Sequence, residues 1–158
     1  MVVRLVKILL AALVITGAVF YFFGCVGEKD RVLVIRDSGS GRIYGKWPLD
    51  KTGEFSIEFV HSVHQSPVRE TFRAGNRMIS PVSVRFDSFG AGMLSDLGEG
   101  QELVRDGDFL VITGFSASFR ELNYIVGTVS DHILFINDEN ISLRELCGRN
   151  AHISIYVR

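Results

Sequence analysis

Beyond residue 30, apolar and polar residues alternate along most of the chain. Phe55, Ile57 and Phe59, for example, are separated from one another by single polar residues. Successive side chains of a β-strand point to opposite faces of a sheet, so this spacing predicts a strand with one buried face. β-branched and aromatic residues, which favour strands, dominate the same segments, and helical spacing is almost absent. The alternation therefore predicts an all-β domain.

Turn-forming residues separate these segments at intervals of roughly 8–12 residues, a spacing typical of all-β domains. Segments 31–36 and 42–47 flank a turn sequence and are expected to pair as a hairpin. The other expected strands are 54–59, 68–72, 82–86, 109–112, 124–126, 132–136 and 152–157. We therefore expect an antiparallel sandwich or barrel of about eight to ten strands. Ser142 and Glu145 form a capping box, which predicts one short helical turn before Gly148.

The first 27 residues form a separate region, in which 21 residues are apolar. Arg4 and Lys7 precede an uncharged run from Ile8 to Gly27. At about 1.5 Å per residue, this run would just cross a hydrocarbon core of about 30 Å. Basic residues before the run favour a cytoplasmic N-terminus. We expect residues 1–27 to be a transmembrane or signal helix that contacts the membrane through residues 8–27, and residues 28–158 to be an extracytoplasmic domain.

Three fates of this N-terminal region remain open. It can stay as a signal anchor with the aromatic residues 21–23 at the outer interface, or it can be cleaved as a secretory signal. It can also be processed as a lipoprotein, with lipid attached to Cys25 after Gly24. Cys147 is the only other cysteine. One hypothesis is a disulfide bond to Cys25. The preferred hypothesis is that Cys147 is a small apolar side chain buried in the domain. The absence of a C-x-x-C sequence excludes a zinc or redox site of that kind.

Charge and hydropathy exclude one class of function. The mean hydropathy of +0.24 is high for a soluble protein, but the apolar excess is confined to the first 27 residues. The net charge is −1, and it becomes −3 without Arg4 and Lys7. A domain of this charge is not expected to bind nucleic acid.

Polar residues that could carry chemistry cluster between His61 and Glu70. Pro67 is incompatible with the middle of a central strand, so this segment is expected to be a corner between two strands. One hypothesis is a metal site in which His61 and His64 bind an ion together with Glu70 or Asp87. A spacing of three residues across a turn can bring two imidazoles onto one ion.

A second hypothesis is nucleophilic hydrolysis by Ser62 or Ser66, with His61 and Glu70 as partners. The sequence has no G-x-S-x-G element that would present the nucleophile on a strained turn. Hydrolysis is therefore less favoured than the other interpretations.

The third interpretation is structural. Arg69 and Glu70 are consecutive, so they are expected to project to opposite faces of their strand. An inward Glu70 needs a polar partner, and Arg85 and Arg120 are the candidates.

A glycine-rich stretch from Phe89 to Gly100 contains four glycines in twelve residues. It is too long for a hairpin turn, so it is expected to be either a functional loop or a surface loop. The residues expected to contact a ligand or partner are His61, Ser62, His64, Arg69, Glu70, Phe89, Gly90 and Gly92.

Four short motifs resemble those of a known family: residues 47–49 (WPL), 59–63 (FVHSV), 66–70 (SPVRE) and 86–93 (FDSFGAGM). Together they resemble domain-of-unknown-function family eighteen-fifty, over roughly residues 31–157. Members of that family are small proteins with an N-terminal membrane segment and an all-β domain. In that family an acidic residue commonly follows the His-Ser-Val motif, where this chain has His64. A proline commonly follows the Gly-Ala-Gly motif and its hydrophobic residues, where this chain has Ser95.

The resemblance also implies a biological setting. Genes of this family tend to lie beside those of TAXI-type TRAP transporters, which take up solutes with an extracytoplasmic binding protein. It implies an accessory or assembly role with the membrane subunits or the solute-binding protein, and it brings no catalytic residue and no cofactor. We therefore expect a non-catalytic accessory protein; the alternative is a small-molecule or metal-binding module that uses the corner from His61 to Glu70.

Overall fold

The structure, a computed structural model, describes residues 31–63, 65–87 and 97–158. In this part of the chain it contains eleven strands and one short helix. In chain order the elements are β1 (Val32–Asp37), β2 (Ile43–Pro48), β3 (Glu54–Val60), β4 (Pro67–Gly75), β5 (Met78–Phe86), β6 (Glu102–Asp106), β7 (Phe109–Thr113), β8 (Glu121–Ile125), β9 (His132–Ile136), β10 (Glu139–Ser142), α2 (Leu143–Cys147) and β11 (His152–Val157). The prediction of an all-β domain is confirmed.

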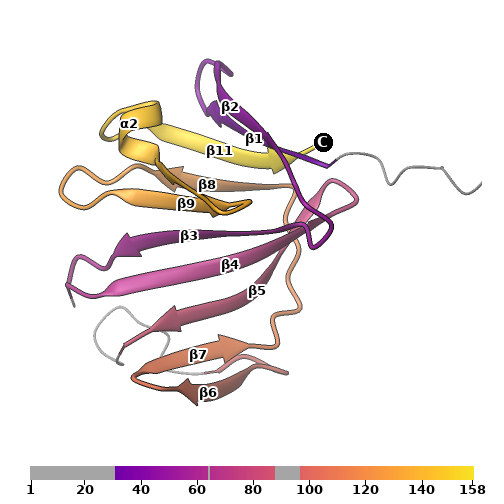
Figure 1. The fold of residues 1–158 in the computed structure, drawn as a ribbon, viewed down its shortest axis with the longest axis vertical. Coiled ribbons are helices and arrows are strands. Elements are labelled where there is room, and N and C mark those ends of the chain that lie inside the picture. Colours follow the sequence, from indigo (N-terminus) through magenta and orange to yellow (C-terminus); the bar gives the residue numbers. More distant parts are fainter. Residues whose placement is uncertain (1–30, 64, 88–96) are drawn as a thin grey trace, which may run out of the picture. The chain divides into compact units, whose positions relative to one another are not determined.

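The strands form two antiparallel sheets (Figure 1). One sheet has four strands in the order β2-β1-β11-β8, and the other has seven in the order β10-β9-β3-β4-β5-β7-β6. Neither sheet closes into a barrel. The expected hairpin of β1 and β2 is present, with Leu33 opposite Trp47.

The described residues contain more strands than the eight to ten that the sequence predicts. The two strands that alternation did not reveal are β6 and β10, and each lies at an edge of the seven-stranded sheet. Every residue of β6 is exposed, and β10 has no buried residue. Because neither strand buries a face, neither needs the apolar alternation that identifies the other strands.

The main core lies between the two sheets. Phe55 and Phe72 are direct partners on β3 and β4, and their rings stack with centroids 5.5 Å apart. The other buried members of this core are Leu33, Ile35, Ile57, Ala74, Ile79, Val126, Leu134, Ile136, Leu143, Ile153, Ile155 and Val157. These residues come from both sheets, so burial of this shared apolar surface holds the sheets together.

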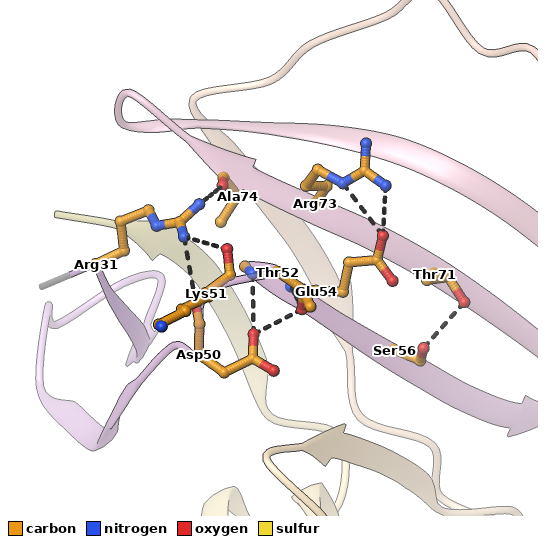
Figure 2. Close-up of polar contacts among 10 residues, drawn as sticks. Arg31, Asp50, Lys51, Thr52, Glu54, Ser56, Thr71, Arg73 and Ala74 are labelled. Atoms are coloured by element: carbon orange, nitrogen blue, oxygen red, sulfur yellow. Dashed lines mark hydrogen bonds and ion pairs between the residues drawn. The ribbon is translucent and has the colours of Figure 1, made fainter. Parts of the chain in front are cut away.

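Arg31 ties the start of β1 to two other segments (Figure 2). Its guanidinium donates to the carbonyl oxygen of Ala74 at 2.9 Å and to those of Asp50 and Lys51 at 3.2 and 2.9 Å. Gly53 lies against this group with φ at +67°, and a Cβ there would be 2.5 Å from Nη1 of Arg31. A larger residue at position 53 would therefore displace the guanidinium and strain the backbone.

The predicted helical turn is also confirmed. The Ser142 hydroxyl oxygen accepts a hydrogen bond from the backbone N–H of Glu145 at 3.0 Å, which caps the first turn of α2. Gly148 ends the helix with φ at +97°, and its N–H donates to the carbonyl of Arg144 at 2.9 Å. Ser142 at the start of α2 and Gly148 at its end therefore have the capping roles that the sequence predicts.

The N-terminal predictions, Cys25 among them, fall on residues 1–30 and lie outside the described residues. Within the described ranges, no helix has the length and apolar character needed to cross a membrane. Cys147 has a free thiol, is half-buried and packs against the main core. Burial raises the pKa of this thiol to about 11, in keeping with a packing role.

Candidate functional site

Glu70 lies in an apolar row on the inward face of the seven-stranded sheet. The pairing register places Leu134, Ile57, Glu70, Val84 and Ile112 side by side on β9, β3, β4, β5 and β7. Four members of this row are apolar, and Glu70 in the centre is the charged exception. A carboxyl group in such a position loses hydration, so it needs a polar partner.

Tyr124 provides that partner from the opposite sheet. Its hydroxyl group donates a hydrogen bond of 2.6 Å to Oε2 of Glu70, so the contact bridges β8 and β4. Burial raises the pKa of Glu70 above the ordinary value of 4.5, and the hydrogen bond from Tyr124 opposes part of that increase. Burial and the neighbouring carboxylate also raise the pKa of Tyr124, so its phenol stays neutral and acts as the donor.

A cavity of about 460 Å³ opens beside this pair. Its walls come from β4, β5, β8 and the segment that precedes β8. The lining residues are Glu70, Phe72, Pro81, Ser83, Val84, Phe115, Ala117, Phe119, Leu122, Asn123 and Tyr124. The volume and the mostly apolar lining with a few polar groups are typical of a site for a small organic molecule.

Within the described part of the chain, one oxygen of the carboxyl group has no hydrogen-bond donor. Tyr124 bonds to Oε2, and no other hydrogen bond to the Glu70 side chain comes from the part of the chain that the structure describes. Oε1 is therefore able to accept a hydrogen bond from a molecule in the cavity.

His132 lies beside the Glu70–Tyr124 pair. Its ring stacks on Phe59 with centroids 5.1 Å apart and meets the edge of Tyr124 at 6.0 Å. The backbone N–H of Gly127 donates to Nδ1 of His132 at 3.2 Å, which assigns the ring proton to Nε2 in the neutral form. Burial lowers the pKa of His132 below its ordinary value, which favours an uncharged imidazole beside Tyr124.

The sequence predicts a corner from His61 to Glu70, but only the part before Pro67 connects β3 and β4, because Pro67 to Glu70 already belong to β4. The His61 N–H donates to the Ser66 carbonyl at 2.9 Å, and the Gln65 N–H donates back to the His61 carbonyl at 2.8 Å. Gln65 has φ at +53°, as a tight turn requires. Ser62 is exposed, whereas Ser66 is buried with 8 % of its surface accessible.

Arg69 and Glu70 project to opposite faces, as the sequence predicts. Nε of Arg69 donates to Oε2 of Glu58 at 2.8 Å on the outward face. The prediction that Arg85 or Arg120 is the partner of Glu70 is wrong. Arg85 lies directly opposite Arg69 and shares its outward face, and Glu70 instead bonds to the phenol of Tyr124.

The metal hypothesis gains no support from the described residues. Within residues 31–63, 65–87 and 97–158, no three His, Cys, Asp or Glu side chains could hold a metal ion, so His61, Glu70 and Asp87 do not form such a group. His64, Phe89, Gly90 and Gly92 lie outside the described residues. The lining of the Glu70 cavity includes none of His61, Ser62 and Ser66.

Sequence reasoning missed Tyr124 as a site residue. The alternation of Leu122, Tyr124 and Val126 was a usable signal, because it places the tyrosine on the same face as two apolar residues that pack in the core. An inward tyrosine needs a hydrogen-bond partner, and an inward Glu70 on another strand needs one as well.

The sequence profile of one family, described as Domain of unknown function (DUF1850), matches residues 55–143, which is more than half of the chain. The match includes both Glu70 and Tyr124. No curated protein and no solved structure matches the chain.

Proposed function

The chain belongs to the family described as Domain of unknown function (DUF1850), and from that premise we propose that it is a non-catalytic binding domain that acts as an accessory of a TAXI-type TRAP solute transporter. The cavity beside Glu70 and Tyr124 is the observation that carries the binding role. The transporter setting rests on the expectation, drawn from the family resemblance, that genes of this family lie beside those of TRAP transporters. The basic and apolar pattern of residues 1–27 supports an anchor in the membrane with the domain outside the cytoplasm.

The lining of the cavity defines the chemistry of its ligand. Phe72, Phe115, Phe119 and Leu122 offer apolar walls, which favour an apolar or aromatic body. Oε1 of Glu70 offers one acceptor at the edge of this surface. We infer that the ligand is a small, largely apolar molecule with a single N–H or O–H donor.

The binding role is testable with indole, which has an aromatic body and one N–H donor. Benzofuran is the matched control, since it has nearly the same shape and no donor. In the full chain with labelled methyl groups, indole should give saturable NMR shifts at Leu122 and Val84, and benzofuran should bind roughly 3–10-fold more weakly, the effect of about one hydrogen bond.

Two variants locate the site. Ala117→Trp should fill the cavity and abolish the shifts, because Ala117 lines it. Glu70→Gln should remove most of the preference for indole over benzofuran, because an amide oxygen is a weaker acceptor than a carboxylate. Shifts that do not saturate, or that are unchanged in Ala117→Trp, would contradict a ligand in this cavity.

The transporter role has a separate test. At native expression and after mild detergent extraction, the full chain should co-purify with the membrane subunits of the transporter. Recovery of the chain alone, in cells whose transporter is active, would contradict the accessory role and would leave the indole experiment unaffected.

A further inference from the structure

A row of charged and aromatic side chains crosses the outward face of the seven-stranded sheet. Glu58 on β3 lies opposite Arg69 on β4, and Arg69 lies opposite Arg85 on β5. Phe135 on β9 and Phe109 on β7 lie on the same face, each two residues along its strand from the residue that pairs with Glu58 or Arg85. Neither these contacts nor the arginines belong to the Glu70 cavity, which lies on the inward face.

Each arginine packs its guanidinium on one of the aromatic rings. The central carbon of the Arg69 guanidinium lies 4.0 Å from the ring centroid of Phe135, and that of Arg85 lies 3.7 Å from the centroid of Phe109. Stacking of this kind fixes the plane of a guanidinium and leaves its N–H edges available as donors. Both arginines are therefore held in place before any partner binds.

The charges of the row are not balanced. Arg69 forms an ion pair with Glu58 at 2.8 Å. Arg85 makes no hydrogen bond or ion pair with any residue that the structure describes, and its buried Nε has no acceptor among those residues. Arg36 and Arg144 also have an unpartnered Nε, but each donates through Nη2 to a protein oxygen. Like charges directly opposite each other on paired strands repel, so a bound anion would reduce the repulsion between Arg69 and Arg85.

A hollow of about 80 Å³ lies at this place, lined by Glu58, Pro67, Arg69, Arg85 and Phe109. We propose that Arg69 and Arg85 bind an oxyanion group, a carboxylate or a phosphate, in this hollow. The volume is more than twice the roughly 30 Å³ of one water molecule, so it suits a single anionic group whose remainder extends into solvent. The planar fork of a guanidinium matches the oxygen pairs of both anions.

The experiment follows the arginine Nε–Hε resonances of the full chain by NMR during titration with sodium phosphate, and separately with sodium acetate, at constant ionic strength against sodium chloride. Phosphate or acetate should shift the Arg85 resonance along a saturable curve with a Kd in the millimolar range or below. Saturation by acetate identifies a carboxylate site, and saturation by phosphate alone identifies a phosphate site. Equal, unsaturated shifts in phosphate, acetate and chloride would overturn the proposal.

Three variants make the test specific. Followed on the Arg69 Nε–Hε resonance, which these variants keep, Arg85→Gln should raise the Kd at least tenfold, and Arg85→Lys, which retains the charge without the fork, should raise it about fivefold. Arg73→Gln is the matched control, because Arg73 is also an outward arginine paired with a glutamate, Glu54, at 2.6 Å but does not line the hollow. Unchanged affinity in the folded Arg85→Lys protein, or an equal loss in Arg73→Gln, would overturn the assignment; backbone amide shifts of β3 and β4 report folding.

Discussion

Arg69 and Glu70 are neighbours in the chain, yet they lie in two different environments. Arg69 has about a third of its side chain exposed and pairs with Glu58 on the outward face. Glu70 is half-buried between the sheets, and its partner is the neutral phenol of Tyr124. Charged side chains of the same sheet are therefore stabilised in two ways. Near water, Arg69 forms an ion pair and stacks on an aromatic ring. Between the sheets, Glu70 has a raised pKa and accepts one hydrogen bond from a neutral group.

The two faces also differ in how their contacts contribute to stability. The inward face depends on apolar burial, with stacked rings such as Phe55 and Phe72. The outward face carries side-chain pairs such as Arg73–Glu54 and Ser56–Thr71 (Figure 2). Truncations on the inward face should therefore lower the free energy of unfolding much more than those on the outward face, and a series of variants can test this difference.

The largest effect is expected from Phe72→Ala. Removal of this buried ring leaves a space against Phe55 and should lower the free energy of unfolding by about 3–5 kcal/mol. Arg73→Ala, at the next residue but on the outward face, is the control and should lower it by less than about 1 kcal/mol. Urea unfolding of both variants measures the difference, and equal losses would refute the contrast between the faces.

Tyr124→Phe should have the next largest effect. It keeps the ring but leaves the Glu70 carboxyl group without its donor, which should lower the free energy of unfolding at pH 7 by about 1–3 kcal/mol. Tyr44→Phe is the matched control, because Tyr44 donates at 3.2 Å to Asp37, a half-buried carboxylate that also accepts from the backbone N–H of Ser40. A loss in Tyr124→Phe no larger than in Tyr44→Phe would show that the buried contact is not the stronger one.

The fold could be predicted from the sequence where burial imposes a pattern. The alternation of Phe55, Ile57 and Phe59 identifies β3, and Ser142 with Gly148 marks both ends of α2. The pairing order could not be predicted, because β11 lies between β1 and β8 through contacts that are distant in sequence. The predicted number of strands was too small, because an exposed edge strand such as β6 needs no alternation of apolar and polar residues.

The candidate site was only half visible in the sequence. The sequence predicts that Glu70 and Arg69 face opposite sides of their strand, and the structure shows that Glu70 is the inward one. Its partner could not be chosen by charge, because Arg85 shares the outward face with Arg69, whereas Tyr124 reaches Glu70 from the other sheet. Only the packing of the two sheets settles that choice.

The pH dependence of stability should be smaller and should depend on Glu70. The folded state raises the pKa of this group, so it binds the proton more tightly than the unfolded chain does. The contribution of Glu70 to stability should therefore be most favourable below the ordinary pKa of 4.5 and should decline as pH rises through the raised folded pKa. The difference in unfolding free energy between wild type and Glu70→Gln should show this decline, with a slope of at most about 1.4 kcal/mol per pH unit. A difference that does not vary with pH would contradict the raised pKa.

The smallest effect is expected from Glu58→Gln on the outward face. Its pair with Arg69 is about a third exposed, so its loss should lower the free energy of unfolding by less than about 1 kcal/mol, and by still less in high salt. The same variant leaves Arg69 and Arg85 without their neighbouring carboxylate, so the affinity for phosphate should rise even as stability falls slightly. Calorimetric titration with phosphate and urea unfolding of one protein sample measure both quantities. A large loss of stability would show that the outward face resembles the inward one, and an unchanged affinity would show that Glu58 does not compete for the arginines.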